Sequence, residues 1–349
     1  MKVLIIGGTR RVGPHLVRGL SGRGHQVTVF HRGISQATLP PGVSELIGDR
    51  RDYARFAEQM AAVDCDVVVD MVCSDDHDAR SLVENFATRV RRAVVISSYE
   101  VYSAYEDAWN RRSSQQPMPI REDAPKRAQV HLYGTDRRYD KVLVEEEILK
   151  AGGEGFPYCI LRWPALYGPG DTTPREWYYV RQALDRRRWI LLPGGGQSIF
   201  CRGYLENMAV SICLAVESPQ ACRQIYNAAD TQALTNRQIA EAVAEIVGHR
   251  WDVVSVPRTL APQVPQTQAL PFSVDPYDIE PHLQFDLTKI RTDLGYEDKV
   301  APDRALARTV RWLCDNPPPA AWLPVSYDDV DRALSAACVH LDREDNPNP

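Results

Sequence analysis

The sequence predicts an α/β protein built on a doubly wound sheet of parallel strands, and three features support this fold class. Short runs rich in valine and isoleucine recur through the first 165 residues, segments of helical periodicity separate them, and glycines follow the first run directly. Runs that are apolar at every position suit strands buried on both faces, as in parallel sheets. Their alternation with helices is typical of βαβ units.

The expected elements follow in chain order. Strands are predicted at 2–6, 26–30, 44–48, 66–72, 93–98 and 158–163, and helices at 12–23, 53–62, 205–217 and 237–247. Residues 103–131 are polar and rich in proline and arginine, which predicts a long surface excursion. We therefore expect three parts, a Rossmann-type domain over 1–165, a smaller C-terminal α+β substrate lobe over 166–315 whose strands can interleave with the first domain, and an extension over 316–349.

Composition narrows the function classes. The chain has 349 residues, is 44% hydrophobic and carries a formal net charge of −5, so no overall basic surface favours nucleic acid. Its eight cysteines are scattered without zinc-ligand spacing, so we expect no metal site and a reducing compartment. No apolar run of 18 residues occurs, so we expect a cytoplasmic protein that does not bind a membrane.

The segment "GGTRRVG" predicts a phosphate-binding loop. Gly7, Gly8 and Gly13 directly follow the first predicted strand, where the first βα turn of such folds sets a pyrophosphate on a helix N-terminus. A glycine would be usual at position 10, but Arg10 and Arg11 stand there. Their side chains can extend toward an adenosine 2′-phosphate while the backbone approaches the pyrophosphate.

The charges near this loop favour NADP(H) over NAD(H). No aspartate or glutamate occurs between Met1 and Ser44, and Arg32 ends the second strand where an NAD-binding protein needs a carboxylate for the ribose 2′-hydroxyl. A guanidinium can instead hold a 2′-phosphate through charge-assisted bonds. The alternative is that these arginines form only a solvated basic face.

Several motifs together resemble those of an atypical extended short-chain dehydrogenase/reductase, over about residues 1–315. They are "GGTRRVG" (7–13), "GDRRD" (48–52), "ISSYEVY" (96–102), "KVLVEE" (141–146), "LRWPALYGPGD" (161–171) and "FDLTKIRTDLGY" (285–296). The resemblance implies that Asp49 accepts from the adenine amino group, that Arg50 lies over the adenine ring, and that Lys141 holds the nicotinamide ribose. It also implies that Ser98 is the catalytic serine, which would hydrogen-bond the substrate carbonyl. The full set of cofactor residues implied by the loop and the resemblance is Gly7, Gly8, Thr9, Arg10, Arg11, Val12, Gly13, Arg32, Asp49, Arg50, Met71, Val72, Cys73, Lys141, Pro164, Ala165 and Leu166.

The chain departs from this family at the acid/base tyrosine. Such a tyrosine stands four residues before the lysine, but the residue there is Arg137, which stays protonated at any working pH. Tyr139 is expected to face away from Lys141, because two helical residues are separated by about 200° of rotation. Tyr133 would serve only if the register slipped by four, and this would displace Lys141 by about 5.4 Å, which argues against the slip.

Three outcomes are compatible with this departure. The protein has lost catalysis and kept binding, or another tyrosine (Tyr99, Tyr102 or Tyr133) donates the proton, or the substrate supplies its own proton. We expect the last outcome, in which a phenol beside the reduced ketone of the substrate donates the proton after hydride addition.

Aromatic residues predict the nature of the substrate. Tyr99, Tyr102, Trp163, Trp177 and Tyr178 are expected to border it, since flat apolar walls suit a large planar ligand. For each of them the alternative is ordinary core packing. The chain also resembles ketoreductases of angucyclinone biosynthesis, which implies NADPH-dependent reduction of an aromatic polyketide. Two alternatives stay open, a nucleotide-sugar epimerase or reductase and a non-catalytic NADP(H)-binding or RNA-binding protein.

Overall fold

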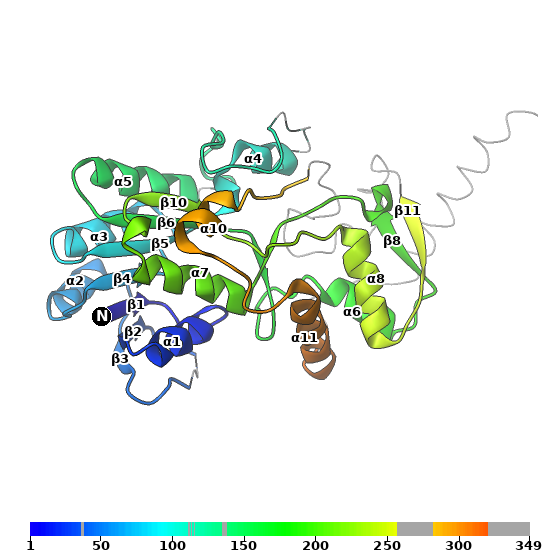
Figure 1. Ribbon diagram of the computed structural model, residues 1–349, viewed down its shortest axis with the longest axis horizontal. Helices are drawn as coiled ribbons and strands as arrows, with labels where there is room; N and C mark the ends of the chain where they lie inside the picture. The colour runs from blue at the N-terminus through cyan, green and yellow to red at the C-terminus, as the bar shows by residue number, and fades with distance from the viewer. Residues whose placement is uncertain are drawn as a thin grey trace, which may run out of the picture.

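A parallel sheet of seven strands forms the centre of the molecule (Figure 1). The computed structural model describes residues 1–35, 38–110, 112, 114, 116–134, 138–256 and 282–319. The strand order is β10-β6-β5-β4-β1-β2-β3, and every neighbouring pair is parallel. The strands are β1 (Lys2–Ile6), β2 (Gln26–His31), β3 (Ser44–Ile47), β4 (Val67–Asp70), β5 (Arg92–Ser98), β6 (Tyr158–Trp163) and β10 (Gln224–Asn227). The predicted fold class is confirmed.

Helices cover both faces of this sheet. One face carries α1 (Gly13–Gly22), α7 (Leu205–Glu217) and α10 (Thr288–Leu294), and the other carries α2 (Tyr53–Ala61), α3 (Asp76–Phe86) and α5 (Lys141–Gly153). Successive side chains of β1 point alternately into the two hydrophobic cores that lie on the two faces of the sheet. Val3 and Ile5 pack with the first group of helices, and Leu4 and Ile6 with the second. This alternation explains why the strand is apolar at every position.

The chain returns to the sheet after it has built the lobe. Strand β10 pairs with β6, with Ile225 opposite Ile160, and α7 packs beside α1. Six of the seven strands coincide with predicted ones, whereas β10 comes from the stretch assigned to the lobe. In space the two predicted parts interleave, as the prediction allowed. The boundary near residue 165 therefore stays a prediction about which residues fold as separate units.

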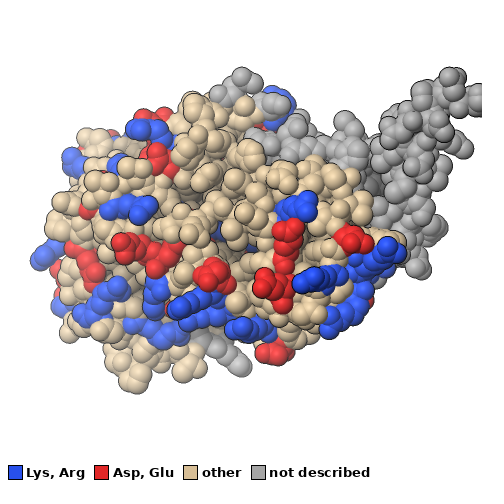
Figure 2. All heavy atoms as spheres, turned by 45° about the vertical axis from the view of Figure 1, so that its right-hand side comes forward, with Lys and Arg blue, Asp and Glu red and all other residues tan. Residues whose placement is uncertain are grey.

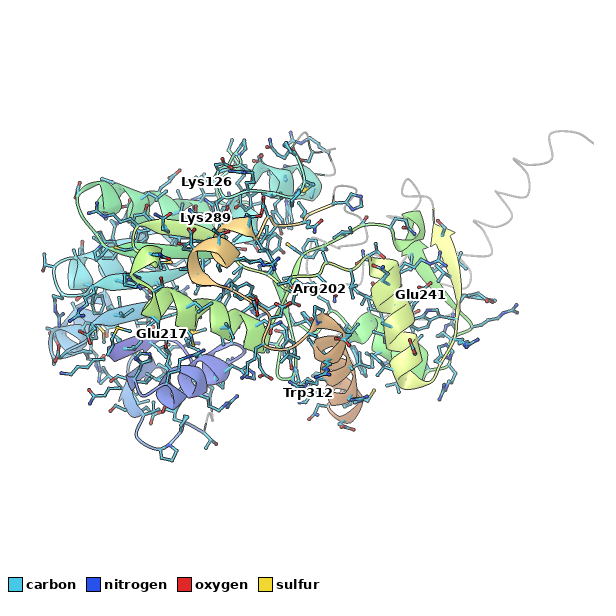
Figure 3. The ribbon with its side chains drawn as sticks, in the orientation of Figure 1. Lys126, Arg202, Glu217, Glu241, Lys289 and Trp312 are labelled. Atoms are coloured by element: carbon cyan, nitrogen blue, oxygen red, sulfur yellow. The ribbon has the colours of Figure 1, made fainter. Side chains whose placement is uncertain are left out.

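The smaller lobe lies beyond the carboxyl ends of the strands, on the right of Figure 1. It contains α6 (Trp177–Leu184), β8 (Trp189–Pro193), α8 (Asn236–Val247), β11 (Asp252–Val256) and α11 (Pro302–Asp315), with β8 and β11 parallel. The ribbon β7 (Ala165–Tyr167) and β9 (Arg202–Tyr204) joins it to the sheet. Arg202 lies at this junction (Figure 3), and its Nη1 is 2.5 Å from Oε1 of the buried Glu176.

The segment predicted as a surface excursion is partly buried. It holds α4 (Ser103–Trp109), which follows the short helix η1 (Tyr99–Val101), and it contains Ile120, which is buried and bridged to Phe285. Two further short helices are η2 (Gly194–Gly196) and η3 (Pro219–Ala221). None of the helices in the described part of the chain is long and apolar enough to span a bilayer. The predicted extension over 316–349 lies outside the described residues, apart from 316–319.

Candidate cofactor cleft and active site

A cleft of about 760 Å³ opens at the carboxyl ends of the strands, where the order reverses between β1 and β4. Ligands of doubly wound folds bind at this place. Most predicted site residues line it, namely Gly7, Gly8, Thr9, Arg10, Arg11, Val12, Arg32, Asp49, Arg50, Met71, Val72, Ser98, Tyr99, Lys141, Trp163, Pro164, Ala165 and Leu166. The cleft therefore gathers residues that are far apart in the sequence.

The glycine-rich loop fits a bound phosphate. Gly7 and Gly8 have φ angles of +98° and +92°, which side chains rarely adopt. A Cβ atom on Gly13 would lie 2.3 Å from the backbone carbon of Gly8, so only glycine lets α1 start this close to the loop. Helix α1 has no side-chain cap at Val12. The N–H groups of Gly13 and His15 donate to the carbonyls of Arg10 and Val12, and Pro14 has no N–H, so the close backbone of the glycines is the feature that suits a phosphate.

The loop arginines point in different directions. Arg10 and Arg32 are exposed and line the cleft. Arg11 differs from the prediction that it extends toward a 2′-phosphate. Its Nε lies 2.8 Å from Oδ1 of Asp171, whose side chain is only 1% exposed, in the segment that follows β7. Arg11 therefore ties the phosphate loop to the other wall of the cleft.

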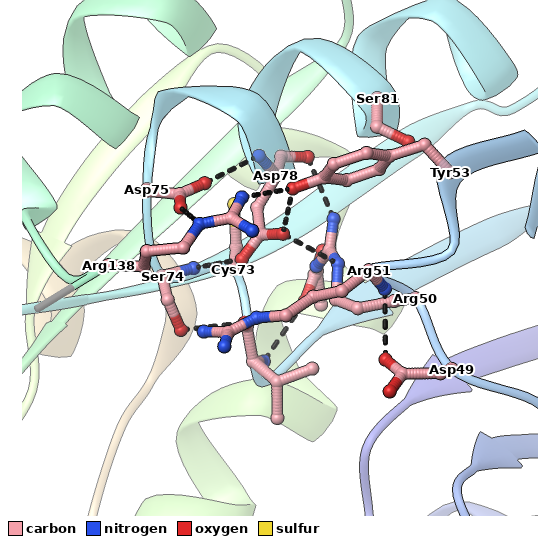
Figure 4. A network of polar contacts seen from close by, with 12 residues as sticks. Asp49, Arg50, Arg51, Tyr53, Cys73, Ser74, Asp75, Asp78, Ser81 and Arg138 are labelled. Carbon is pink, nitrogen blue, oxygen red and sulfur yellow. Dashed lines mark hydrogen bonds and ion pairs between the residues drawn. The ribbon is translucent and has the colours of Figure 1, made fainter.

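Arg50 also differs from the prediction. Its side chain is buried, pairs with Asp70, lies 3.3 Å from Asp78 Oδ1, and donates to the Asp78 carbonyl at 2.7 Å (Figure 4). Burial lowers the pKa of Arg50, but the two carboxylates outweigh it, so the pKa is raised above the ordinary value. The guanidinium is thus held beneath the loop and is not free to stack on adenine. The exposed Arg51 lines the cleft, and its N–H donates to Asp49 Oδ1 at 2.9 Å.

The loop after β4 is fixed by the same carboxylates. Asp70 Oδ1 accepts from the Val72 N–H at 3.0 Å, and Asp78 Oδ2 accepts from the Ser74 N–H at 2.8 Å. Met71 and Val72 border the cleft as predicted, whereas the Cys73 side chain turns into the core and Ser74 lines the cleft. Cys73 instead packs in the hydrophobic core between the sheet and α2, α3 and α5, so it is lost to the site.

Lys141 is the first residue of α5 and is buried. Its Nζ donates to the carbonyls of Cys73, at 2.6 Å, and Ile96, at 2.8 Å. Burial lowers the pKa of Lys141 from its ordinary value. Asp140 caps the helix by accepting from the Val142 N–H at 2.9 Å.

Tyr139 lies in the active site, so the prediction that it faces away from Lys141 is wrong. The rotation argument assumed that residue 139 is helical, but α5 begins at Lys141. The Tyr139 ring centroid is 5.6 Å from Lys141 Nζ, and its side chain hydrogen-bonds with Ser98 and Glu100. The signal that could have placed it is Asp140, since aspartate is a preferred N-cap residue. Arg137, which occupies the expected tyrosine position, lies outside the described residues.

Both neighbours of Tyr139 are anchored. Arg138 Nε lies 3.1 Å from Asp75 Oδ2, and its Nη2 donates to the Tyr53 hydroxyl at 2.8 Å, as Figure 4 shows. On the other side, Asp140 accepts from Arg127 Nη2 at 2.5 Å and from the His131 N–H at 2.6 Å. Tyr139 is therefore held on a defined segment rather than on a free loop.

Two of the five predicted substrate residues line the cleft, and the other three lie elsewhere in the structure. Tyr99 and Trp163 line the cleft. Tyr102 is buried elsewhere, where its hydroxyl donates to Asn227 Oδ1 at 2.6 Å and accepts from Arg162 at 2.8 Å. Trp177 and Tyr178 lie in the core of the lobe. For these three residues core packing explains the aromatic character.

Several residues that line the cleft lie outside the predicted site, among them Ser74, Glu100, Thr173 and Arg175. No motif marks the last two, because they reach the cleft only through the fold of the segment after β7. Within the described ranges, no three histidine, cysteine, aspartate or glutamate side chains are grouped so that they could hold a metal ion.

Comparison with known proteins agrees with this architecture. The family model described as "NAD dependent epimerase/dehydratase family" matches residues 3–229. The chain belongs to this family. Among solved structures, UDP-glucose 4-epimerase of Thermotoga maritima superposes with a TM-score of 0.68 at 18% identity, covering 90% of this chain and 99% of the other. At that identity the likeness concerns the fold.

Two curated relatives of this chain are named for different functions, one for binding and one for reduction. The chain is 27% identical over 261 residues to the chloroplast stem-loop binding protein of 41 kDa b of Arabidopsis thaliana, covering 71% of this chain and 63% of that protein. The chain thus spans less than two thirds of that relative's length. It is 26% identical over 267 residues to 2′-dehydrokanamycin reductase of Streptomyces kanamyceticus, covering 74% of this chain and 70% of that protein.

Membership of the epimerase/dehydratase family gives the cleft its general role. The family is named for NAD-dependent enzymes, and a reductase is among the relatives. The tight glycines after β1, which let the loop backbone approach a ligand closely, fit the diphosphate of such a dinucleotide. Ser98 ends β5 and Lys141 begins α5, whereas Arg32 and Asp49 follow β2 and β3 on the other side of β1, so the two groups lie at opposite ends of the cleft.

Proposed function

We propose that this protein is an NADPH-dependent ketoreductase that reduces a carbonyl group of an aromatic polyketide, of the angucyclinone kind, in antibiotic biosynthesis. The observation that carries the proposal is the cluster of Ser98, Tyr139 and Lys141 at one end of a dinucleotide-sized cleft. A phenol, a hydroxyl and a cation in contact are the groups needed to hold and protonate a carbonyl oxygen.

Charge at the opposite end supports NADP(H) as the cofactor. Arg10, Arg32 and Arg51 are exposed and line the cleft, so they can surround a 2′-phosphate. The first carboxylate of the chain, Glu45, is occupied, since its Oε1 lies 2.6 Å from Nε2 of His31. The 2′-phosphate would therefore meet mainly cations.

The chain's own residues supply the proton in this proposal. When bound, the reduced nicotinamide supplies a hydride to the carbonyl carbon. Ser98 hydrogen-bonds the carbonyl oxygen and Tyr139 donates its hydroxyl proton to that oxygen. The ammonium of Lys141, 5.6 Å from the Tyr139 ring, stabilises the phenolate left behind. Because Tyr139 is in place, protonation by a neighbouring phenol of the substrate is no longer required.

The substrate class rests on two supports. Tyr99 and Trp163 give the cleft aromatic walls that suit a planar ring system. The loop "GGTRRVG" and Arg137 resemble the NADPH-dependent angucyclinone 7-ketoreductase of simocyclinone biosynthesis, although neither relative reported above acts on a polyketide by its name. The relative named 2′-dehydrokanamycin reductase favours a reductase of a natural product more generally.

The experiment is a screen of NADPH oxidation against quinoid aromatic polyketide ketones and sugar nucleotides, followed by Tyr139→Phe. We expect turnover with a ketone and a loss of kcat of about 10²–10⁴-fold in the variant, with the NADPH Kd unchanged. Tyr158→Phe is the matched control, because Tyr158 begins β6 at the end of the strand away from the cleft. Full activity of Tyr139→Phe would show that Tyr139 does not donate the proton, and a proton supplied by the substrate would then be the better explanation.

A nucleotide-sugar epimerase or reductase is the second candidate, favoured by the family description. Arg175 and Thr173 line the cleft and could meet a sugar diphosphate. The same screen decides, since turnover with sugar nucleotides and none with polyketide ketones would replace the first candidate.

A non-catalytic RNA-binding role is the third candidate, and a relative is named a stem-loop binding protein. On the face drawn in Figure 2, basic side chains run along the lower edge and acidic side chains interrupt them. An electrostatic RNA site needs clustered cations. We therefore propose a small-molecule substrate, and a filter-binding assay with salt-dependent RNA affinity would contradict it.

A further inference from the structure

Glu100 is a carboxyl group at the active site that the proposed reaction does not yet use. It follows β5 in the short helix η1 and lines the cleft. Its carboxyl group receives hydrogen bonds from the side chains of Tyr133 and Tyr139. Tyr139 in turn hydrogen-bonds with Ser98. A chain of polar groups thus passes from Tyr133 through Glu100 to the hydroxyl that faces the substrate.

The polarity of these hydrogen bonds depends on the charge of Glu100. An ionised carboxylate only accepts, so both tyrosine hydroxyls must direct their hydrogens toward it. In that state the Tyr139 proton points away from a substrate bound at Ser98. A protonated Glu100 can instead donate to the Tyr139 oxygen, which frees the Tyr139 hydrogen to turn toward the substrate.

We propose that Glu100 is a proton reservoir that acts through Tyr139 and makes the rate of reduction depend on its protonated form and the rate of oxidation on its ionised form; this rests on the proposed reductase function. In reduction, a hydride from the reduced nicotinamide forms the C–H bond, the Tyr139 O–H breaks and its proton joins the carbonyl oxygen. The Glu100 O–H then breaks and reprotonates Tyr139, and a solvent proton restores Glu100. In oxidation, each of these steps runs backward, with ionised Glu100 accepting the proton.

A path for that solvent proton exists. The Tyr133 and Tyr105 hydroxyls are 2.7 Å apart, and Tyr133 is only half-buried. Trp109 packs edge-on against Tyr133, with ring centroids 4.9 Å apart, which fixes the orientation of its ring. Tyr133 therefore links Glu100 to the surface near α4.

The surroundings of Glu100 adjust its proton affinity. Burial raises the pKa of Glu100 from its ordinary value, while hydrogen bonds from Tyr133 and Tyr139 and the charges of Lys141 and Arg127 act against that rise. The other ionisable groups that face it are Tyr99 and Tyr105, both with raised pKa from burial. Arg127 also fixes its backbone, because its Nε donates to the Glu100 carbonyl at 2.9 Å.

The first test is the pH dependence of reduction in three proteins. In the wild type, kcat is expected to fall about tenfold per pH unit above the pKa of Glu100, because only the protonated form reloads Tyr139. Glu100→Gln should lower kcat and remove this pH dependence, while Glu154→Gln, an exposed residue at the end of α5, keeps the wild-type profile. Tyr133→Phe removes a donor to the carboxylate, so the fall should move about one unit to higher pH.

The second test reads Tyr139 without turnover. The charge of Glu100 raises the pKa of Tyr139, after the larger effect of burial. In the ligand-free protein, tyrosinate absorbance assigned by subtraction of Tyr139→Phe should therefore appear at lower pH in Glu100→Gln than in the wild type. Turnover with no such shift, or with an unchanged pH profile in Glu100→Gln, contradicts the reservoir alone. A shift without turnover on any ketone contradicts the proposed function alone.

Discussion

The pair formed by Arg11 and Asp171 predicts an asymmetric loss of stability. Asp171 is almost fully buried, and Arg11 is its cationic partner at 2.8 Å. Arg11→Ala leaves a buried carboxylate without a counter-charge, which costs about 3–5 kcal/mol when both groups are buried. Because a third of the Arg11 side chain is exposed, we expect a smaller loss, about 2 kcal/mol.

The reverse change should cost less. Asp171→Asn keeps the shape, can still accept from the Thr173 hydroxyl 3.3 Å away, and leaves a partly exposed cation that water can solvate. We expect a loss of about 1 kcal/mol. The double variant Arg11→Ala/Asp171→Asn buries no charge, so it should be more stable than Arg11→Ala alone, with a coupling energy of at least about 1 kcal/mol.

The assay is equilibrium unfolding in urea followed by tryptophan fluorescence, with m-values compared across the variants. Arg237→Ala is the control, because its pair with Glu241 on α8 is exposed and should contribute less than about 0.5 kcal/mol. Additive effects of the two single substitutions, or an Arg11→Ala protein as stable as the wild type, would show that the Arg11–Asp171 pair does not stabilise the contact between the phosphate loop and the segment after β7.

Three further predictions concern the cofactor and pH. Arg32→Asp should raise the KM for NADPH and lower that for NADH, and unchanged values in steady-state kinetics would remove Arg32 from the site. Gly13→Ala should abolish dinucleotide binding measured by fluorescence, since its Cβ would lie 2.3 Å from the backbone of Gly8, and binding within twofold of the wild type would contradict the close approach. Burial raises the pKa of Asp230 to about 6 from 3.8, so this acid binds protons more tightly when folded, and the free energy of unfolding should fall as pH rises from about 4 to about 6. Asp230→Asn should flatten that fall in urea titrations at each pH, and an equally steep fall in the variant would assign it to other groups.

The sequence predicts the sheet well because burial on both faces leaves a local signature. Strands β1 and β4 contain continuous apolar runs, and all of β1 to β6 lie where strands were predicted, although the edge strand β3 (SELI) is mostly exposed. Strand β10, "QIYN", is short and half polar, and its place beside β6 depends on α7 returning along the sheet. Such long-range pairing has no local pattern in the chain.

Site residues were predictable where the backbone geometry requires one residue type. They were harder to predict where the position of a side chain depends on charged partners from other elements. Gly7, Gly8 and Gly13 follow from backbone geometry alone. Arg50 looks like an exposed cation until Asp70 and Asp78 are brought beneath it from β4 and α3. Tyr139 was expected outside the site because residue 139 was assumed to be part of the helix. Helix α5 begins at Lys141, so the helical rotation does not apply to Tyr139. Element ends are the least certain part of such reasoning.

Because α7 and β10 return to the sheet, only part of the lobe, α6 and β8 between β7 and β9, is inserted into the dinucleotide-binding half, while α8, β11 and α11 follow β10. A fragment ended near residue 165 would lack β10, so the edge of β6 would offer unpaired backbone groups, and the apolar face of α1 that α7 covers would meet water. Such a fragment is expected to aggregate. The chain between β7 and β9, by contrast, leaves and re-enters through a paired ribbon. A substrate pocket grafted between these two strands would therefore leave every strand of the large sheet in place, but it would also have to match α8, β11 and α11, which share one core with α6 and β8.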